Sequence, residues 1–389
     1  MTGRTNRVAV VGAGQTAYGA LPHPPRALLR QALFEALGSV DHGLSAEEVG
    51  EGYLATLGFG GWQIGNPASL LAEELGRPGL PVSHVENACA SGSTGLRQAY
   101  HALRSGACDV ALVAGVEKMT DQPSARRRFW LGVSGETEWE RLAGLTFAGV
   151  YALLAERYLH ERHLSPDVLG AVAVKNHAHG AMNPLAHLRK PVTLDQHRAA
   201  PQVADPLGLY DCCPVSDGAA AVVLAREDVA RRYTDTPVWI EGSGGGSDFL
   251  ALQDRTSLTT LPASRKAAEE AFRHAPFARE KVQLAELHDC FTIAELLALE
   301  DTGLVTPGEA PRATLEGRTR IGGALPVNPS GGLKSKGHPL GATGVGQVVE
   351  VFHQLRKEAG PRQVQGAERA LAHNVGGSGA TALVHLFGV

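Results

Sequence analysis

One local pattern occurs twice in this chain of 389 residues, and it limits the possible folds more than any other feature. In the first copy, a short strand leads through a sharp turn into a small-residue helix, and an apolar run typical of a buried strand follows; the second copy repeats the order of strand, helix and strand. The expected elements are strands at 81–86, 110–115, 284–287 and 380–386 and helices at 92–104 and 345–355. Strand–helix–strand units build layered folds, so the pattern predicts an α/β protein.

The two helices also begin alike. Gly-Ser-Thr-Gly at 92–95 is echoed by Gly-Ala-Thr-Gly at 341–344, an offset of 249 residues. A helix that starts with small residues lets its backbone approach another chain segment closely. Together with the matching strand order, the echo favours two similar halves around one site.

Two other glycine clusters are interpreted as turns. Residues 8–11 are expected to form a strand that enters a turn at 12–14, where the third glycine of a dinucleotide-binding motif is missing. The run 242–246 is expected to be a flexible turn between domains. Between the halves, residues 118–209 are interpreted as a loop-rich insertion that covers a site, and the first half resumes near residue 210.

Charge and cysteine usage exclude several classes. A net charge of −4 offers no electrostatic surface for nucleic acid, and no apolar stretch is long enough to span a membrane. Five cysteines without a Cys-x-x-Cys spacing argue against a disulfide framework and a zinc site, and Cys212 and Cys213 are expected to pack at a turn. Free thiols and the lack of a targeting signal predict a cytoplasmic protein.

Cys89 is the first candidate for chemistry. It lies at the expected strand-to-helix junction, where unpaired N–H groups and the helix dipole favour a thiolate and small neighbours leave room for a substrate. A buried core cysteine is the alternative that this segment alone leaves open.

Three further segments carry groups that such a cysteine needs. His338 stands between glycine and proline at a helix start, where it could act as a base or serve the loop. His288 and Cys290 follow a strand, and the glycine turn at 376–379 has N–H groups free to face an oxyanion. The histidines at 177, 179 and 187 are more simply explained by loop structure or substrate contact than by a metal.

Four of these segments resemble the thiolases, over essentially the whole chain. The matching stretches are Asn-Ala-Cys-Ala-Ser-Gly-Ser at 87–93, Leu-Pro-Ala-Ser-Arg-Lys at 261–266, the highly specific run 328–344 and the glycine turn at 376–379. Where commoner thiolases have Asn-Glu-Ala-Phe, this chain has His-Asp-Cys-Phe at 288–291, and His373 replaces their second cysteine. Both differences occur together in the sterol-carrier-protein-type and archaeal-type thiolases.

The resemblance implies a thiolase fold of layers αβαβα. Its N-terminal half would comprise residues 1–117 and 210–262, its covering domain 118–209 and its C-terminal half 263–389. It also implies a dimer or a dimer of dimers.

The resemblance further implies a role for each motif residue. Cys89 would be the nucleophile and His338 the base that takes its proton, while Cys290 would exchange a proton with the α-carbon of acetyl-CoA. His288, through a water, and His338 would polarise the thioester oxygen. The N–H groups of Cys89 and Val375 would form an oxyanion hole, and Ser264 would contact pantetheine. Coenzyme A and acyl-CoA would be substrates, with no permanently bound cofactor and no metal.

The implied activity is acyl transfer between CoA thioesters in lipid and fatty acid metabolism, by thiolysis of a 3-ketoacyl-CoA or the reverse Claisen condensation. The alternative is a partner-dependent acyltransferase or retro-aldolase subunit that works with a small OB-fold and zinc-ribbon protein. Retention of Cys89, Cys290 and His338 argues against the aldolase, and Cys290 argues against a decarboxylating synthase.

Overall fold

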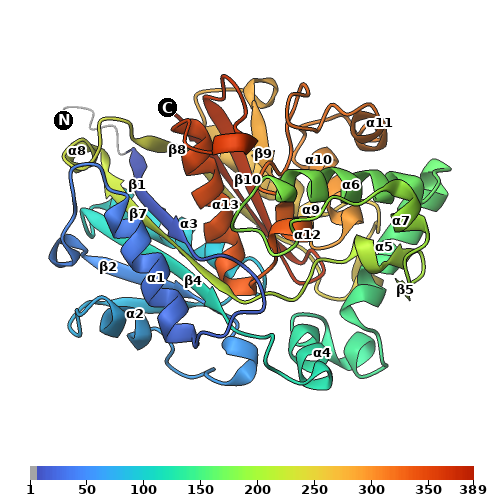
Figure 1. Cartoon of the computed structure of the whole chain (residues 1–389), viewed down its shortest axis with the longest axis horizontal. Helices are drawn as coiled ribbons and strands as arrows, with labels where there is room; N and C mark the ends of the chain where they lie inside the picture. The colour runs from blue at the N-terminus through green and yellow to red at the C-terminus, as the bar shows by residue number, and fades with distance from the viewer. Residues whose placement is uncertain (1–6) are drawn as a thin grey trace.

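The computed structural model describes residues 7–389 and contains a sheet of nine strands in the order β3-β2-β4-β7-β1-β8-β11-β10-β9 (Figure 1). Residues 1–6, which we assigned to the first half, lie outside this description. The strands are β1 (Val8–Gln15), β2 (Glu51–Ala55), β3 (Val82–Val85), β4 (Val110–Glu117), β7 (Gly218–Arg226), β8 (Val238–Ser247), β9 (Leu284–Glu286), β10 (Arg369–Gly376) and β11 (Thr381–Gly388). A separate ladder pairs β5 (Gln202–Ala204) with β6 (Leu207–Gly208).

The sheet consists of two halves with matching topology. In the first, β2 pairs in parallel with β4, and β7 and β1 continue antiparallel. In the second, β9 pairs in parallel with β10, and β11 and β8 continue antiparallel. The halves meet where β1 pairs antiparallel with β8 through Val8–Ile240, Ala9–Trp239 and Val10–Val238. This pairing confirms the expected two similar halves.

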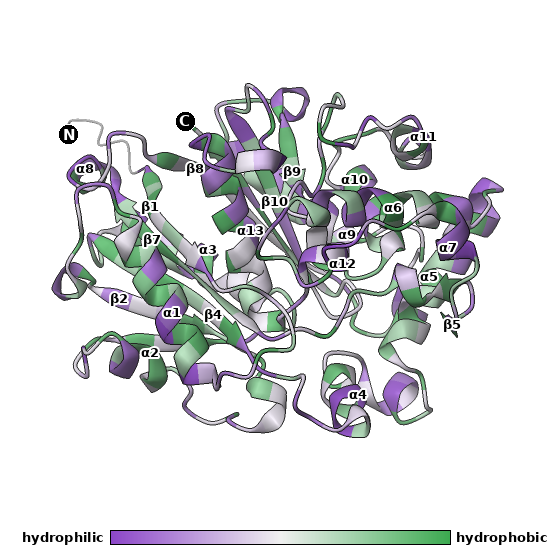
Figure 2. Ribbon diagram, in the orientation of Figure 1, coloured by the Kyte–Doolittle hydropathy of each residue, from purple (hydrophilic) through white to green (hydrophobic). Residues whose placement is uncertain are grey.

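Helices lie outside and between these halves. Helix α1 covers β1 and β7, and α9 covers β8 and β11, while α3 and α13 pack against each other between the halves. Alternate residues of β1 therefore face different cores: Val8 and Val10 face the central helices, and Ala9 and Val11 face α1. These helices are α1 (Pro25–Gly38), α3 (Ser91–Ser105), α9 (Pro262–His274) and α13 (Leu340–Leu355). The central strands are coloured mainly as hydrophobic in Figure 2 because both their faces are covered.

The glycine echo marks the crossing of α3 and α13. A Cβ on Gly92 would lie 2.9 Å from the carbonyl oxygen of Gly341, and one on Gly344 would lie 2.5 Å from the backbone nitrogen of Ser93. Only glycine permits this approach. The close contact expected of the two helix starts is therefore a contact between them.

Two glycine clusters are strands, and the prediction of turns was wrong. Residues 242–246 belong to β8, where Gly242, Gly244 and Gly246 face the backbone of α9 so closely that a Cβ would overlap it. Gly12 and Gly14 belong to β1 and face the backbone of α1 in the same way. Local sequence cannot distinguish a glycine needed for a turn from one needed for close packing.

The covering segment, residues 118–209, contains more helix than expected. Its first part contains α4 and a short π-helix, and its second part consists mainly of two long helices. The elements are α4 (Ser124–Gly132), the π-helix Thr137–Arg141, α5 (Phe147–Arg162), α6 (Asp167–Ala181) and α7 (Leu194–Arg198). In Figure 1 these helices lie beside the second half of the sheet and below it.

The remaining helices are α2 (Ser69–Glu74), α8 (Glu227–Ala230), α10 (Thr292–Asp301), α11 (Ala310–Leu315) and α12 (Gly332–Lys336). Within residues 7–389, no helix is long and apolar enough to cross a membrane.

Candidate active site

Cys89 lies between β3 and α3, two residues before the helix begins. Ala88 has a φ of 48°, a left-handed conformation that non-glycine residues rarely adopt. The hydroxyl of Ser91 fastens this turn, since it accepts from the Asn87 N–H at 2.8 Å and donates to the Ala88 carbonyl at 2.6 Å. Cys89 is therefore held at the end of α3 that meets α13.

His338 occupies the equivalent position in the second half. It lies 249 residues after Cys89, the offset of the glycine echo, and two residues before α13. Its Nδ1 lies 2.6 Å from the hydroxyl oxygen of Thr343, which itself donates to the Pro339 carbonyl at 2.9 Å. Because a hydroxyl has one proton, the Thr343 oxygen must accept from Nδ1–H. Nε2 of His338 is then left as an acceptor.

His288 has the opposite tautomer. The side-chain nitrogen of Asn374 lies 2.9 Å from His288 Nδ1, and an amide NH₂ group only donates. The ring proton of His288 therefore lies on Nε2. Neither Nε2 atom, of His288 or of His338, has a hydrogen-bond partner among the described residues. The two imidazoles can thus divide the work of accepting and donating a proton.

Cys89, His288 and His338 converge on one point. The Cys89 sulfur and one ring nitrogen of each histidine all lie within 4.8 Å of one another. The imidazole rings are 5.2 Å apart and nearly perpendicular. Such a set could serve as metal ligands, but the proton on Nε2 of His288 blocks coordination in this tautomer. Proton transfer between thiol and imidazole is the chemistry that the arrangement suits.

Burial dominates the electrostatics of this cluster. It raises the pKa of the Cys89 thiol to about 12, although the N–H of Gly377 hydrogen-bonds the sulfur and opposes the shift. The backbone N–H of Cys89 at the helix start also favours the thiolate, as expected, but burial outweighs both N–H groups. Burial also lowers the pKa of His338 to about 3 and that of His288 well below its usual value, the latter with help from neighbouring histidines. The thiol and both imidazoles are neutral at pH 7.

The expected oxyanion hole involves the turn after β10. Val375 lies in that strand, opposite Ala382 of β11, and its N–H stays a prediction for the hole. The N–H that contacts the Cys89 sulfur belongs to Gly377, two residues further on. The sequence identified the glycine turn but not Gly377 itself.

Cys290 lines a cavity of about 540 Å³ together with Cys89 and His338. Burial raises the pKa of the Cys290 thiol well above its usual value. Cys212 and Cys213 also line the cavity, so they do more than pack at a turn. Within the described residues, neither His288 nor Ser264 lines it.

Ser264 forms a hydrogen bond that the sequence did not indicate. It is fully buried at the start of α9, and its hydroxyl oxygen lies 2.8 Å from Nε2 of His373. The histidine that replaces the usual second cysteine is therefore occupied by the serine. A hydroxyl can donate and accept at once, so a contact of Ser264 with pantetheine stays a prediction.

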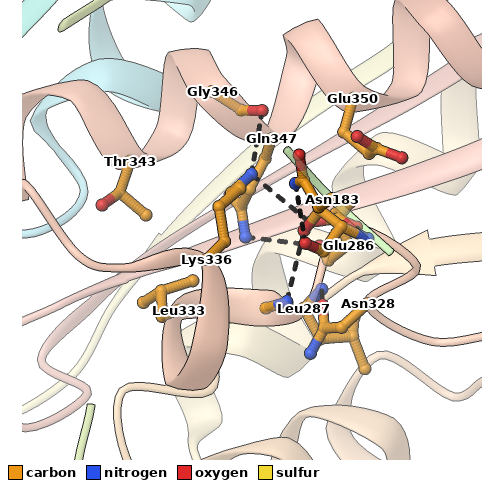
Figure 3. Close-up of polar contacts among 12 residues, drawn as sticks. Asn183, Glu286, Leu287, Asn328, Leu333, Lys336, Thr343, Gly346, Gln347 and Glu350 are labelled. Atoms are coloured by element: carbon orange, nitrogen blue, oxygen red, sulfur yellow. Dashed lines mark hydrogen bonds and ion pairs between the residues drawn. The ribbon is translucent and has the colours of Figure 1, made fainter. Parts of the chain in front are cut away.

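A buried ion pair lies beside the segments that carry His288 and His338. Glu286 and Lys336 stand two residues before His288 and His338, and Lys336 Nζ lies 3.9 Å from a Glu286 carboxylate oxygen and 3.1 Å from the Gly346 carbonyl (Figure 3). The hydroxyl of Ser330 donates to the same carboxylate at 2.7 Å. Strand β9, helix α12 and helix α13 are thereby joined directly behind the site.

The covering segment forms much of the cavity wall. Phe129, Leu131, Leu145 and Phe147 supply apolar surface, and two arginines, Arg128 and Arg141, line it as well. Of the basic run 126–128, which could face either solvent or CoA, Arg128 is thus the member at the cavity. An apolar cavity with cationic groups suits a thioester attached to a phosphate-bearing carrier.

The histidines of the covering segment have structural contacts. His177 and His179 lie on α6, a helix where a loop was expected. His179 Nδ1 lies 3.0 Å from the Asn328 carbonyl, and its Nε2 accepts the Ile321 N–H at 3.1 Å. His187 contacts the Ser216 hydroxyl at 2.9 Å.

Comparisons with known proteins cover both halves. A model described as thiolase, N-terminal domain, matches residues 8–228, and one described as thiolase C-terminal domain-like matches residues 244–389. An acetyl-CoA acetyltransferase of Methanothermobacter thermautotrophicus is 44% identical over 383 residues, with 98% of this chain and 99% of that protein covered. Sterol carrier protein 2 of Gallus gallus is 34% identical, with coverages of 96% and 70%. The solved Ltp2-ChsH2(DUF35) aldolase has a TM-score of 0.85, 24% identity and 98% coverage of both chains, which shows a shared fold.

Proposed function

The chain belongs to the thiolase family, and from this premise we propose that it transfers acyl groups between CoA thioesters through an acyl-cysteine at Cys89. The observation that carries the proposal is the convergence of the Cys89 sulfur with the ring nitrogens of His288 and His338 within 4.8 Å. Coenzyme A and its thioesters are substrates, and no cofactor stays bound.

In the first half-reaction, His338 activates Cys89. Its unprotonated Nε2 takes the thiol proton while the sulfur attacks the thioester carbon, so the carbon–sulfur bond to Cys89 forms and a tetrahedral oxyanion develops. The N–H of Cys89, with that of Val375, stabilises this oxyanion. Because a thiol with a pKa of about 12 is scarcely ionised at pH 7, the base is required.

Departure of CoA moves a second proton. The bond to the CoA sulfur breaks, and Cys290 gives its thiol proton to that sulfur. The site then holds acyl-Cys89, a Cys290 thiolate and a His338 imidazolium. Cys290 lines the same cavity as Cys89, which supports this role.

In the condensing direction, the Cys290 thiolate removes an α-proton from a second acetyl-CoA. The enolate oxygen faces the Nε2–H group of protonated His338 and, through a water, that of His288, and the enolate carbon attacks acyl-Cys89. The released Cys89 sulfur recovers its proton from His338, so every group returns to its starting state. Thiolysis is the same sequence in reverse.

The CoA nucleotide is proposed to lie against Arg128 and Arg141, because guanidinium groups suit phosphate and both line the cavity. We further propose a cytoplasmic homodimer that acts on acyl-CoA of lipid metabolism. A small OB-fold subunit is an additional proposed partner. Gel filtration, alone and after addition of such a subunit, tests both assemblies.

The deciding experiment is covalent labelling. The purified chain is incubated with acetyl-CoA or acetoacetyl-CoA and analysed by intact-mass and peptide mass spectrometry, with Cys89→Ala as the control. We expect one acyl group on the Cys89 peptide, absent from the variant and removed by free CoA. An unlabelled protein, with or without an added subunit, would overturn the proposal.

A further inference from the structure

Tyr151 connects the glycine turn to the second thiol. It lies on α5 of the covering segment, is fully buried, and donates its hydroxyl proton to the Gly377 carbonyl at 2.9 Å. Its ring stacks on that of Phe291, with ring centres 4.6 Å apart. Phe291 follows Cys290 directly, so this stacking brings the tyrosine alongside the cysteine.

The Tyr151 hydroxyl also interacts with the Cys290 side chain, since a hydrogen bond between them lowers the pKa of the thiol and raises that of the tyrosine. The backbone N–H of Gly377 is in use as well, because it contacts the Cys89 sulfur. The two backbone polar groups of Gly377 and the Tyr151 hydroxyl therefore link the two thiols of the site. Neither the sequence motifs nor the mechanism above assigns Tyr151 a role.

We propose that Tyr151 is a positioning residue that holds Cys290 and stabilises its thiolate, a role that rests on the proposed acyl transfer. With Cys290 protonated, the tyrosine donates to Gly377 and accepts from the thiol. Once Cys290 has given its proton to the departing CoA sulfur, the same hydroxyl donates to the thiolate. No covalent bond to Tyr151 forms or breaks, and burial, which raises the pKa of its hydroxyl well above the usual value, keeps its proton in place.

The test compares Tyr151→Phe with Tyr158→Phe. Tyr158 is a second fully buried tyrosine of α5, and its hydroxyl donates to Glu300 at 2.8 Å. The control thus removes one buried hydroxyl from the same helix without touching the cysteine. Thermal melting followed by circular dichroism compares the stability of the two variants.

The readout is alkylation of Cys290 by iodoacetamide, followed by peptide mass spectrometry across a pH series without substrate. Losing a hydrogen bond to a charged group should raise the pKa of the Cys290 thiol by about 1 to 2 units. At a given pH, Cys290 of the Tyr151→Phe variant should therefore be alkylated about 10- to 100-fold more slowly than in the wild type. Alkylation of Cys89 should stay within about threefold, since the N–H of Gly377 remains. Tyr158→Phe should change neither rate.

Unchanged alkylation of Cys290, or equal slowing at both thiols, would overturn the inference. If Tyr151→Phe does not fold, 3-fluorotyrosine at position 151 provides a stronger donor and should accelerate alkylation of Cys290 instead. The assay needs no turnover. If acyl-Cys89 did not form, the proposed function would be refuted, but the alkylation rates of Cys290 in the variants could still be compared.

Discussion

Replacing Thr343 by valine should remove the base from the site without changing its shape. In the wild type, the Thr343 hydroxyl oxygen accepts from Nδ1–H of His338 at 2.6 Å and thereby leaves Nε2 free to take the Cys89 proton. Valine keeps the branched side chain and removes the acceptor. The Pro339 carbonyl, to which Thr343 also donates, retains the N–H groups of Ala342 and Thr343 at 3.0 and 2.9 Å. The damage should therefore be confined to the imidazole.

The size of the effect follows from the lost acceptor. A buried N–H without a partner costs about 1–3 kcal/mol, and this cost shifts the imidazole toward the tautomer that carries its proton on Nε2. The fraction of His338 able to accept a proton, and with it the rate of Cys89 acylation, should fall by about 5- to 100-fold.

Rapid acid quenching of the enzyme with acetyl-CoA, followed by intact-mass analysis, measures that rate. Thr343→Ser keeps the hydroxyl and serves as the matched control, with acylation expected within about threefold of wild type. If the valine variant acylated Cys89 as fast as the serine variant, Thr343 would not set the tautomer and the assignment of His338 as base would lose its support.

Three further outcomes are expected. The rate of Cys89 acylation should be flat between about pH 5 and 9, because the thiol pKa of about 12 and the imidazole pKa of about 3 both lie outside this range; quench measurements showing a tenfold rise per pH unit would contradict it. Gly344→Ala puts a Cβ 2.5 Å from the α3 backbone, and urea unfolding should show a free energy of unfolding lower by about 3 kcal/mol or more. Gly38→Ala, whose Cβ would have nothing within 4 Å, should be nearly neutral in the same assay. Lys336→Met leaves Glu286 buried without its cation and should lower the free energy of unfolding by about 3–5 kcal/mol. Adding Glu286→Gln should restore most of this loss. Burial already raises the pKa of this carboxyl, and losing the lysine raises it further, so the loss should grow as the pH rises; a loss independent of pH would show that the pair is not what stabilises the fold.

The sequence was informative wherever a motif residue stands at the start of an element. Cys89 and His338 lie two residues before equivalent helices, so their identity and spacing were visible in the chain itself. The groups that tune them were not, because Asn374, Thr343 and Tyr151 meet their partners only through tertiary packing. Burial likewise decides the ionisation of the Cys89 thiol, and no local pattern reports its depth.

Packing also explains the expectations that failed. The residues 242–246 have the composition of a flexible turn, but they belong to β8. There the glycines allow α9 to pack directly on the strand, because a Cβ would overlap the helix backbone. The pantetheine contact of Ser264 stays a prediction, but the hydrogen bond between its hydroxyl and His373 could not be predicted from the segment either. In each case the deciding neighbour lies far away in the chain.

The join between the halves has a consequence for motion. A hinge motion that separates the two halves would break the β1–β8 ladder. It would also separate α3 from α13, whose backbones are in close contact at Gly92 and Gly344. The frame that sets the distance between thiol and imidazole is therefore stiff on the timescale of turnover. A substrate as long as acyl-CoA therefore has to enter past the cavity wall that the covering segment contributes. Local movement of α4 and the π-helix beside it, rather than hinge bending between the halves, should set the rate at which substrates enter and products leave.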